Sequence, residues 1–334
     1  MQSELFVIPP FPEQANTTFK FIDLFAGVGG FRMALQNIGG SCVFSSEWNN
    51  HAQTTYQINY GETPVGDITN SNNKAQIPEK FDILCGGFPC QAFSIAGNQK
   101  GFQETRGTLF FDIAEIAEKH QPKVIFLENV KNLVSHDKGN TFDVIKNTLK
   151  NLGYAVYYKV LNSMLHANVP QNRERIFIVA FHESKVPNHA EFEFPNEIPL
   201  TKTIHDLLER EKVDAKYYYK PDHMYYPKLQ ESMTSRDTLY QWRRVYVREN
   251  KSNVCPTLTA NMGAGGHNVP LLVDNFGIRK LTPKECFAFQ GYPVDKMVFP
   301  EKMANSALYM QAGNSVTMPL IQRIGEQIVK VINS

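Results

Sequence analysis

Short hydrophobic runs alternate with segments of helical periodicity between residues 19 and 181. The runs are rich in β-branched and aromatic residues and have the length of buried strands. They predict strands at Phe19–Phe25, Cys42–Ser45, Phe81–Cys85, Val124–Glu128, Tyr154–Leu161 and Arg175–Ala180. The intervening segments predict helices at Gly30–Ile38, Asn50–Asn59, Leu109–His120 and Thr141–Leu152. Strands that alternate with helices of this length predict an α/β fold with a doubly wound, mostly parallel sheet.

This alternation stops near residue 195, and a clear helical pattern returns at Val316–Val331. The intervening segment is rich in Tyr and Lys and carries clustered glycines at Gly263–Gly266. We therefore expect an irregular leader at 1–18, a first domain at 19–195 and a smaller inserted domain at 196–304. A C-terminal segment at 305–334 is expected to return to the first domain.

The composition is that of an ordinary globular protein, with 42% hydrophobic and 20% charged residues. No hydrophobic run approaches the roughly 18 residues that a membrane span needs, and no secretory signal pattern opens the chain. Five cysteines without a CxxC pair argue against a disulfide framework or a zinc ribbon, so we expect a cytoplasmic protein without a metal site. Residues 201–280 hold 13 Lys and Arg against 9 Asp and Glu, which fits a polyanionic partner or a solvated surface.

A glycine-rich turn, FIDLFAGVGGFR, follows the first predicted strand. Gly27 and Gly29 fit a dinucleotide-binding turn, but Arg32 occupies the third glycine position. Glu47 lies 20 residues after Gly27, where a carboxylate can bind the two hydroxyls of a ribose. Asp67 follows the next helix and could reach an adenine amino group. The turn alone is equally well explained by tight packing, but together with Glu47 and Asp67 it favours an adenosine-containing cofactor.

Residues that could take part in catalysis follow or precede three later strands. Cys90 lies after Pro89 on a loop at a strand end, where a thiolate nucleophile is plausible, whereas Cys85 lies in a hydrophobic run and is expected to be buried. The segment Gln91–Gly107 has the glycines and the length of a lid. Glu128 ends another strand, and two arginines of the sequence QNRERIFIVA, Arg173 and Arg175, precede the next. These groups could surround one small planar substrate, or each could belong to a structural ion pair.

The ordered set of motifs resembles the cytosine-5 DNA methyltransferase family, in particular bacterial modification enzymes of the HhaI and HpaII type. The motifs are FIDLFAGVGG, GFPCQAFS, ENV, QNRERIFIVA, RKLTPKECFAFQGYP and QAGNSVTMP. The resemblance covers residues 19–181 and 279–332. It implies a Rossmann-like fold that binds S-adenosylmethionine, and it identifies the inserted domain as a target-recognition domain.

The resemblance also implies residue roles. Cys90 would add to carbon 6 of a flipped-out cytosine, Glu128 would hold the ring at nitrogen 3 and the exocyclic amine, and Arg175 and Arg173 would stabilise charge at the carbonyl side. The methyl donor, S-adenosylmethionine, would be bound by Phe25, Gly27, Gly29, Glu47, Trp48, Asp67, Pro89 and Asn314.

The expected substrate is a short specific sequence in duplex DNA. Ser94 on the lid would contact a phosphate, Arg244 and Thr257 align with base-reading positions, and Gln241 would fill the vacated stack. We expect a monomer that modifies DNA alongside a cognate restriction endonuclease. A tRNA methyltransferase of the same fold and a catalytically silent DNA-binding member remain alternatives. A nicotinamide dehydrogenase fits poorly, because Arg32 breaks the glycine fingerprint.

Overall fold

The computed structural model describes residues 8–88, 109–264 and 269–334. The chain forms two compact units, which are described separately. The first unit comprises residues up to Leu161, Glu174–Pro195 and Ile321–Ser334. The second comprises Asn162–Arg173 and Asn196–Leu320. Residues 305–320, which we expected to return to the first domain, thus cluster with the second unit.

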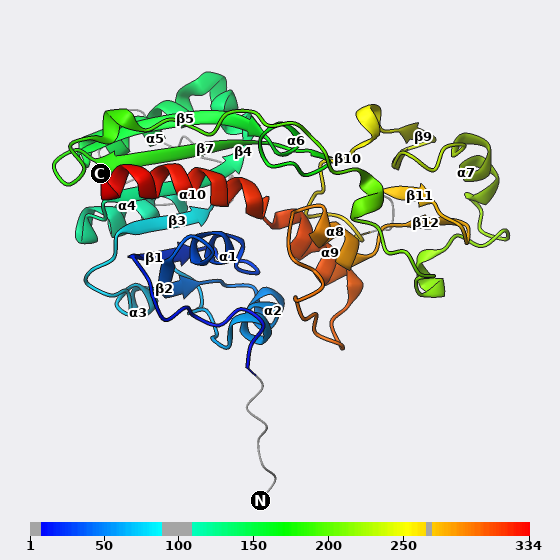
Figure 1. The fold of residues 1–334 in the computed structure, drawn as a ribbon, viewed down its shortest axis with the longest axis horizontal. Coiled ribbons are helices and arrows are strands. Elements are labelled where there is room, and N and C mark those ends of the chain that lie inside the picture. The colour runs from blue at the N-terminus through cyan, green and yellow to red at the C-terminus, as the bar shows by residue number, and fades with distance from the viewer. Residues whose placement is uncertain (1–7, 89–108, 265–268) are drawn as a thin grey trace, which may run out of the picture. The chain divides into compact units, whose positions relative to one another are not determined.

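A six-stranded sheet forms the centre of the first unit (Figure 1). Its strands are β1 (Phe19–Leu24), β2 (Gly40–Ser46), β3 (Ile83–Gly87), β4 (Val124–Val130), β5 (Tyr154–Asn162) and β7 (Glu174–His182). The strand order is β2-β1-β3-β4-β7-β5. Neighbours from β2 to β4 run parallel, and β7 runs antiparallel to β4. The predicted α/β architecture with a mostly parallel sheet is confirmed.

Helices cover both faces of this sheet. The helices of the first unit are α1 (Gly30–Gln36), α2 (Asn50–Tyr60), α3 (Ser71–Lys74), α4 (Leu109–His120), α5 (Asn140–Asn151) and the larger part of α10 (Met318–Asn333). Helices α4 and α5 share one hydrophobic cluster with alternate strand residues such as Ile22 and Leu84. Helix α1 lies on the opposite face, where Phe31 contacts Phe126 edge-on. Because successive strand side chains point to opposite faces, both layers are filled from the same strands.

Local signals in the sequence fix the ends of α2. The Asn49 side chain accepts hydrogen bonds from the backbone N–H of His51 and Ala52, which caps the first turn. Gly61 ends the helix in the left-handed conformation with a φ of 78°. Glu47 lies in the connection between β2 and α2, and Asp67 lies in the loop after α2, so these caps help to define where both carboxylates lie.

The second unit is built around a small antiparallel sheet and a hydrophobic cluster. Its elements are α6 (Ser163–His166), β6 (Gln171–Asn172), α7 (Tyr226–Ser232), β8 (Tyr240–Arg243), β9 (Tyr246–Glu249), β10 (Cys255–Pro256), β11 (Leu271–Val273), β12 (Ile278–Lys280), α8 (Pro283–Ala288) and α9 (Asn305–Asn314). The sheet has the order β12-β11-β8-β9, and β10 pairs in parallel with β6. Leu229, Tyr240 and Leu271 belong to the cluster that joins α7 to this sheet.

A buried ion pair explains the charged residues of the motif RKLTPKE. Arg279 and Glu285 are fully buried and form a two-pronged contact, with N–O distances of 2.7 and 2.8 Å. Arg279 also donates from Nε to Asp274 at 2.6 Å. Burial of an arginine is tolerable only with such a complete set of acceptors. These residues hold strand β12 to helix α8 and are structural.

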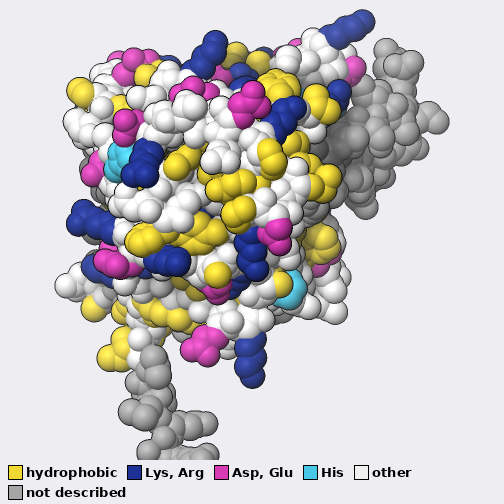
Figure 2. Space-filling model, turned by 90° about the vertical axis from the view of Figure 1, so that its right-hand side faces the viewer, with side chains coloured by type: hydrophobic (Ala, Val, Ile, Leu, Met, Phe, Trp, Pro, Cys, Tyr) yellow, Lys and Arg dark blue, Asp and Glu magenta, His cyan; other side chains and the backbone are white. Residues whose placement is uncertain are grey.

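The surface of the molecule shows mixed charge on the face drawn in Figure 2. There, Lys and Arg side chains lie interspersed with Asp and Glu rather than gathered in one basic patch (Figure 2). Within the described ranges, none of the helices has the length and hydrophobicity to cross a membrane.

Candidate active site

The glycine-rich turn after β1 has an unusual backbone. Phe25, Gly27 and Gly29 adopt positive φ angles of 57°, 56° and 82°. A Cβ atom at Gly29 would lie 2.4 Å from the ring of Tyr60, so only glycine fits there. The Tyr60 hydroxyl also donates a hydrogen bond to the Gly29 carbonyl at 2.8 Å. A positive φ is rare for phenylalanine, and such strain is typical of ligand-binding turns.

Glu47 at the end of β2 connects this turn to the start of α2. Its two carboxylate oxygens accept hydrogen bonds of 2.8 Å from the backbone N–H of Gly27 and of Asn49. Burial raises the pKa of Glu47, and these backbone donors counteract the rise. A carboxylate oxygen has two lone pairs, so capacity remains for further donors such as sugar hydroxyls.

A cavity of about 170 Å³ opens beside Glu47. It is lined by Phe25, Ser46, Glu47, Trp48, Gly66, Asp67, Ile68, Thr69 and Leu109. Four residues proposed from the sequence therefore meet here: Phe25, Glu47, Trp48 and Asp67. Trp48 is 73% exposed although it is large and apolar, and the buried Ser46 Oγ has no hydrogen-bond partner in the described part of the chain. An exposed ring and an unsatisfied hydroxyl are features of a ligand site, and they fit an adenosine moiety.

Ser46, Ile68 and Leu109 are lining residues that sequence reasoning missed. Ile68 is 2% exposed and follows Asp67 directly. The sequence did offer a signal for Ile68, because an adenine ring needs an apolar surface and Ile68 is next to Asp67, the expected adenine-binding carboxylate. Ser46 and Leu109 carried no such signal.

Arg32, which breaks the glycine fingerprint, has a structural explanation. It is fully buried and donates to both carboxylate oxygens of Glu62, at 2.8 and 2.9 Å. Its guanidinium lies over the rings of Tyr56 and Tyr60, 5.4 and 4.7 Å from their centroids. The N-terminal leader joins this cluster, because Phe11 contacts Tyr60. Arg32 thus anchors Tyr60, the residue that holds the Gly29 carbonyl.

Glu128 and Arg175 meet at the ends of two adjacent strands. Glu128 is on β4 and Arg175 on the antiparallel β7, and Arg175 Nε lies 3.1 Å from Glu128 Oε1. Arg175 also donates to the backbone carbonyl of Glu174 at 2.9 Å. Both side chains are largely buried, with exposed fractions of 11% and 15%. A carboxylate and a guanidinium side by side offer an acceptor and donors to one planar ligand.

Arg173 has different surroundings from those we predicted. It is 2% exposed and donates to the backbone carbonyls of Leu258, Gly313 and Ser315, at 2.8, 3.3 and 2.7 Å. All of these acceptors are in the second unit. These bonds hold the ends of two segments together. Asn314, between two of the acceptors, is exposed at the end of α9.

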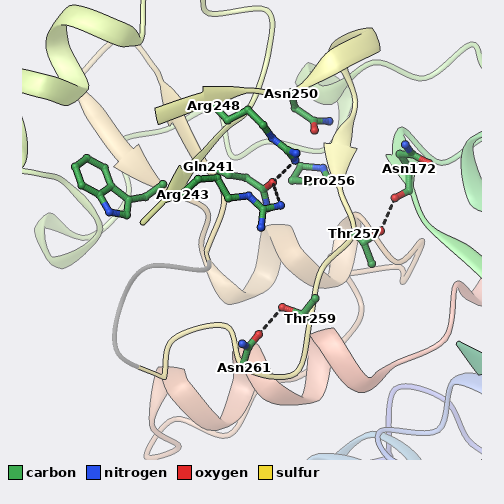
Figure 3. A pocket seen from close by; sticks show the side chains of 10 residues that line it. Asn172, Gln241, Arg243, Arg248, Asn250, Pro256, Thr257, Thr259 and Asn261 are labelled. Atoms are coloured by element: carbon green, nitrogen blue, oxygen red, sulfur yellow. Dashed lines mark hydrogen bonds between the residues drawn. The ribbon is translucent and has the colours of Figure 1, made fainter. Parts of the chain in front are cut away.

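A cavity of about 350 Å³ in the second unit contains two of the predicted DNA-binding residues (Figure 3). Gln241 and Thr257 line it, together with Asn172, Trp242, Arg243, Arg248, Asn250, Pro256, Thr259 and Asn261. Thr257 Oγ1 donates to the Asn172 carbonyl at 2.6 Å. Arg244 does not line this cavity. It lies in the β8–β9 turn with a φ of 52°, and its carbonyl accepts from Trp242 Nε1.

Cys90, Pro89 and Ser94 lie outside the described residues, as does the whole of the expected lid, Gln91–Gly107. The four described cysteines, Cys42, Cys85, Cys255 and Cys286, are all buried. Burial raises the pKa of each of these thiols, that of Cys42 to about 12. All four are therefore protonated at neutral pH and poor nucleophiles. Cys85 is buried as expected.

The sequence matches the family model of C-5 cytosine-specific DNA methylases over residues 19–330. The chain belongs to this family. The methylase is 51% identical to the Type II methyltransferase M.Bsp6I of Bacillus sp. (strain RFL6), over 93% of this chain and 98% of that protein. It is 44% identical to the Type II methyltransferase M.HpaII of Haemophilus parainfluenzae, over 95% and 90% of the two chains. The methylase uses S-adenosylmethionine as the methyl donor and methylates carbon 5 of cytosine in DNA.

Solved structures share the fold of the methylase. The crystal structure of the S. pombe Dnmt2 methyltransferase matches with a TM-score of 0.69 and 18% identity, over 93% of this chain and 98% of that chain. A putative DNA modification methyltransferase encoded within an E. coli prophage matches with a TM-score of 0.68 and 20% identity, over 95% and 100%. At these identities the likeness concerns the fold, and it confirms the Rossmann-like class.

We expect Tyr60→Phe to weaken binding of the methyl donor. The substitution removes the hydroxyl that holds the Gly29 carbonyl, and a hydrogen bond of this kind contributes about 0.5–1.5 kcal/mol. The KM for S-adenosylmethionine should rise about two- to tenfold, with kcat at saturating donor nearly unchanged. Tyr56→Phe is the matched control, because the Tyr56 hydroxyl accepts from Arg32 and does not contact the turn. Equal KM values in both variants would contradict a positioning role for Tyr60.

Asp23 on β1 makes the stability of the methylase depend on pH. It is fully buried, and burial raises its pKa to about 8. Between about pH 4 and pH 8 the folded protein keeps a proton that the unfolded chain releases. The contribution of Asp23 to the free energy of unfolding therefore falls as pH rises through this window, by up to about 1.4 kcal/mol per pH unit.

The Asp23→Asn variant removes this dependence. Compared with wild type, it should gain stability steadily from pH 5 to pH 7.5, as measured by urea unfolding at several pH values. If the difference in stability between Asp23→Asn and wild type is the same at pH 5 and at pH 7.5, Asp23 does not titrate in this range.

Proposed function

We propose that this methylase modifies cytosine in one short sequence of duplex DNA, with Cys90, Glu128 and Arg175 acting on the flipped-out base. The observation that supports the proposal is the contact of Glu128 with Arg175 at two adjacent strand ends. The carbon atoms that react lie inside the base stack of a duplex, so the target nucleotide has to leave the helix.

Each proposed role follows from the chemistry of the side chain. Cys90 adds through its thiolate to carbon 6, which makes carbon 5 nucleophilic. Glu128 holds the ring at nitrogen 3 and the exocyclic amine, and Arg175 stabilises charge at the carbonyl oxygen. Carbon 5 would receive the methyl group with S-adenosylhomocysteine as the leaving group. It would then lose its proton to solvent, and elimination of the Cys90 thiolate would restore the ring.

The methyl donor would bind in the cavity beside Glu47. The buried Glu47 would bind the ribose hydroxyls, and the exposed Asp67 would accept a hydrogen bond from the adenine amino group. Trp48 and Phe25 would contribute apolar contacts, with Pro89 and Asn314 as further proposed contacts. When bound, S-adenosylmethionine supplies an electrophilic methyl group.

We further propose that the enzyme acts as a monomer in the cytoplasm and protects DNA from a cognate restriction endonuclease. The support is the high identity to two proteins that are named Type II methyltransferases. The chain covers nearly their whole length, so the same arrangement of domains is available to it.

Transfer of labelled methyl groups to unmethylated plasmid DNA tests the proposal. The label should appear in 5-methylcytosine, and base-resolution mapping should place it at one short repeated sequence. Label distributed over unrelated cytosines would contradict a specific target. Absence of label from DNA together with label in tRNA would favour an RNA substrate, and purified enzyme should elute at the mass of one chain.

A further inference from the structure

The β8–β9 hairpin presents two different faces. In its register Gln241 lies opposite Arg248 and Trp242 lies opposite Val247. Because side chains alternate along a strand, Trp242 and Val247 point to one face, where they pack on the hydrophobic cluster of the second unit. Gln241, Arg243 and Arg248 point to the other face, and together with part of Trp242 they line the 350 Å³ cavity.

A single amide group holds both arginines on this second face. Gln241 Oε1 accepts a hydrogen bond from Arg243 Nη2 at 2.8 Å and one from Arg248 Nη2 at 2.6 Å. Figure 3 shows both guanidinium groups converging on this oxygen. A carbonyl oxygen has two lone pairs, so the two bonds fully use its capacity. The two cations are thus fixed in adjacent positions.

This arrangement calls for an external acceptor. A guanidinium has five N–H donors and no acceptor, and neither Arg243 nor Arg248 forms an ion pair with a carboxylate in the described part of the chain. Two like charges held together repel each other, and an acceptor-rich ligand relieves this repulsion. The hairpin itself is held in place, since Tyr225 stacks on Trp242 with ring centroids 4.4 Å apart.

The guanidinium groups, which are exposed at the cavity, have the shape to bind the edge of a guanine base. The cavity wall also carries amides and hydroxyls, from Asn172, Asn250, Thr259 and Asn261. Such side chains can hydrogen-bond to base edges as well as to phosphates. Arginine pairs with O6 and N7 of guanine through two parallel hydrogen bonds from its planar guanidinium. Gln241 holds each guanidinium in position for such a pair.

We propose that Arg243 and Arg248 read guanine bases of the target sequence and that Gln241 positions their guanidinium groups. The inference rests on the proposed duplex DNA substrate and deepens it by naming the bases read. The inference assigns base reading to Arg243 on β8 and Arg248 on β9, whereas the sequence led us to expect it at Arg244. The methylated sequence should accordingly contain guanine beside the target cytosine.

The test replaces guanine by 7-deazaguanine, which lacks the N7 acceptor, at each guanine of the mapped sequence in turn. For wild type, kcat/KM should fall about tenfold at two of these positions. Arg248→Ala should lose about tenfold on the normal duplex and show no further loss with 7-deazaguanine at one position, and Arg243→Ala should do the same at the other. Arg248→Lys keeps the charge but lacks the fork, so it should behave like Arg248→Ala.

Arg244→Ala is the matched control, because it removes the same charge from the same hairpin outside the cavity. It should retain the full 7-deazaguanine penalty. Equilibrium binding of the same duplexes repeats the comparison without turnover. A mapped sequence without guanine would overturn the proposal. So would a full loss of kcat/KM with 7-deazaguanine in both Arg243→Ala and Arg248→Ala, which would leave phosphate contacts as the role of these arginines. Failure of wild type to methylate DNA would instead refute the proposed function.

Discussion

The Cys90→Ser enzyme is expected to transfer no measurable methyl label to DNA. A thiol reacts as its thiolate, and a serine hydroxyl is not ionised to any useful extent at neutral pH. Specific DNA binding should stay within about tenfold of wild type, because groove and phosphate contacts supply most of the affinity. Labelled methyl transfer and a binding titration on one duplex measure both quantities.

Cys286→Ala provides the control for this experiment. Cys286 is buried on α8, and burial raises the pKa of its thiol well above the usual value, so it should not contribute a nucleophile. Turnover should be retained in this variant. Substantial turnover in Cys90→Ser would remove Cys90 from the mechanism.

The Glu128→Gln enzyme should lose at least about 100-fold in the rate of methyl transfer. The substitution keeps the size of the side chain but removes the negative charge that faces Arg175 and replaces one of the two acceptor oxygens by an NH2 donor. Single-turnover rates at saturating DNA report this step directly, and the affinity for DNA should change little. An unchanged rate would show that Glu128 serves only as the partner of Arg175.

Glu174→Gln is the matched control for Glu128→Gln. Glu174 is at the start of β7 next to Arg175, and its carboxylate pairs with Lys131 near the surface. Exposed ion pairs contribute about 0–1 kcal/mol, so methyl transfer should be close to that of wild type. A comparable loss in both variants would indicate general damage to the strand ends rather than a specific role for Glu128.

Local sequence patterns were sufficient to predict the first unit. Hydrophobic runs and helical periodicity identified the strands and helices of the α/β unit, because these patterns act over neighbouring residues. They also brought Phe25, Glu47 and Asp67 to one cavity, since carboxyl ends of parallel strands meet at one edge of a sheet.

Contacts between distant residues could not be predicted in the same way. Arg32 appeared only as a departure from a fingerprint, because its partner Glu62 is 30 residues away. The three carbonyls bound by Arg173 depend on the pairing of two short strands, which has no local signal. In the β8–β9 hairpin, the alternation of Tyr240, Trp242 and Val247 was a usable signal. It would have shown that Gln241, Arg243 and Arg248 share a face.

The interleaving of the two units also determines the order in which the protein can assemble during synthesis. Helix α10 completes the first unit: Gly325 lies against Leu35 and Ile38 of the α1 region, and Ile324 and Ile328 are fully buried. The ribosome makes α10 only after the whole second unit. A nascent chain therefore leaves the part of this face beside α1 uncovered until this late stage, and such exposed apolar surface promotes aggregation and attracts chaperones. Chains that stop before α10 should be degraded rather than accumulate as partly active enzymes.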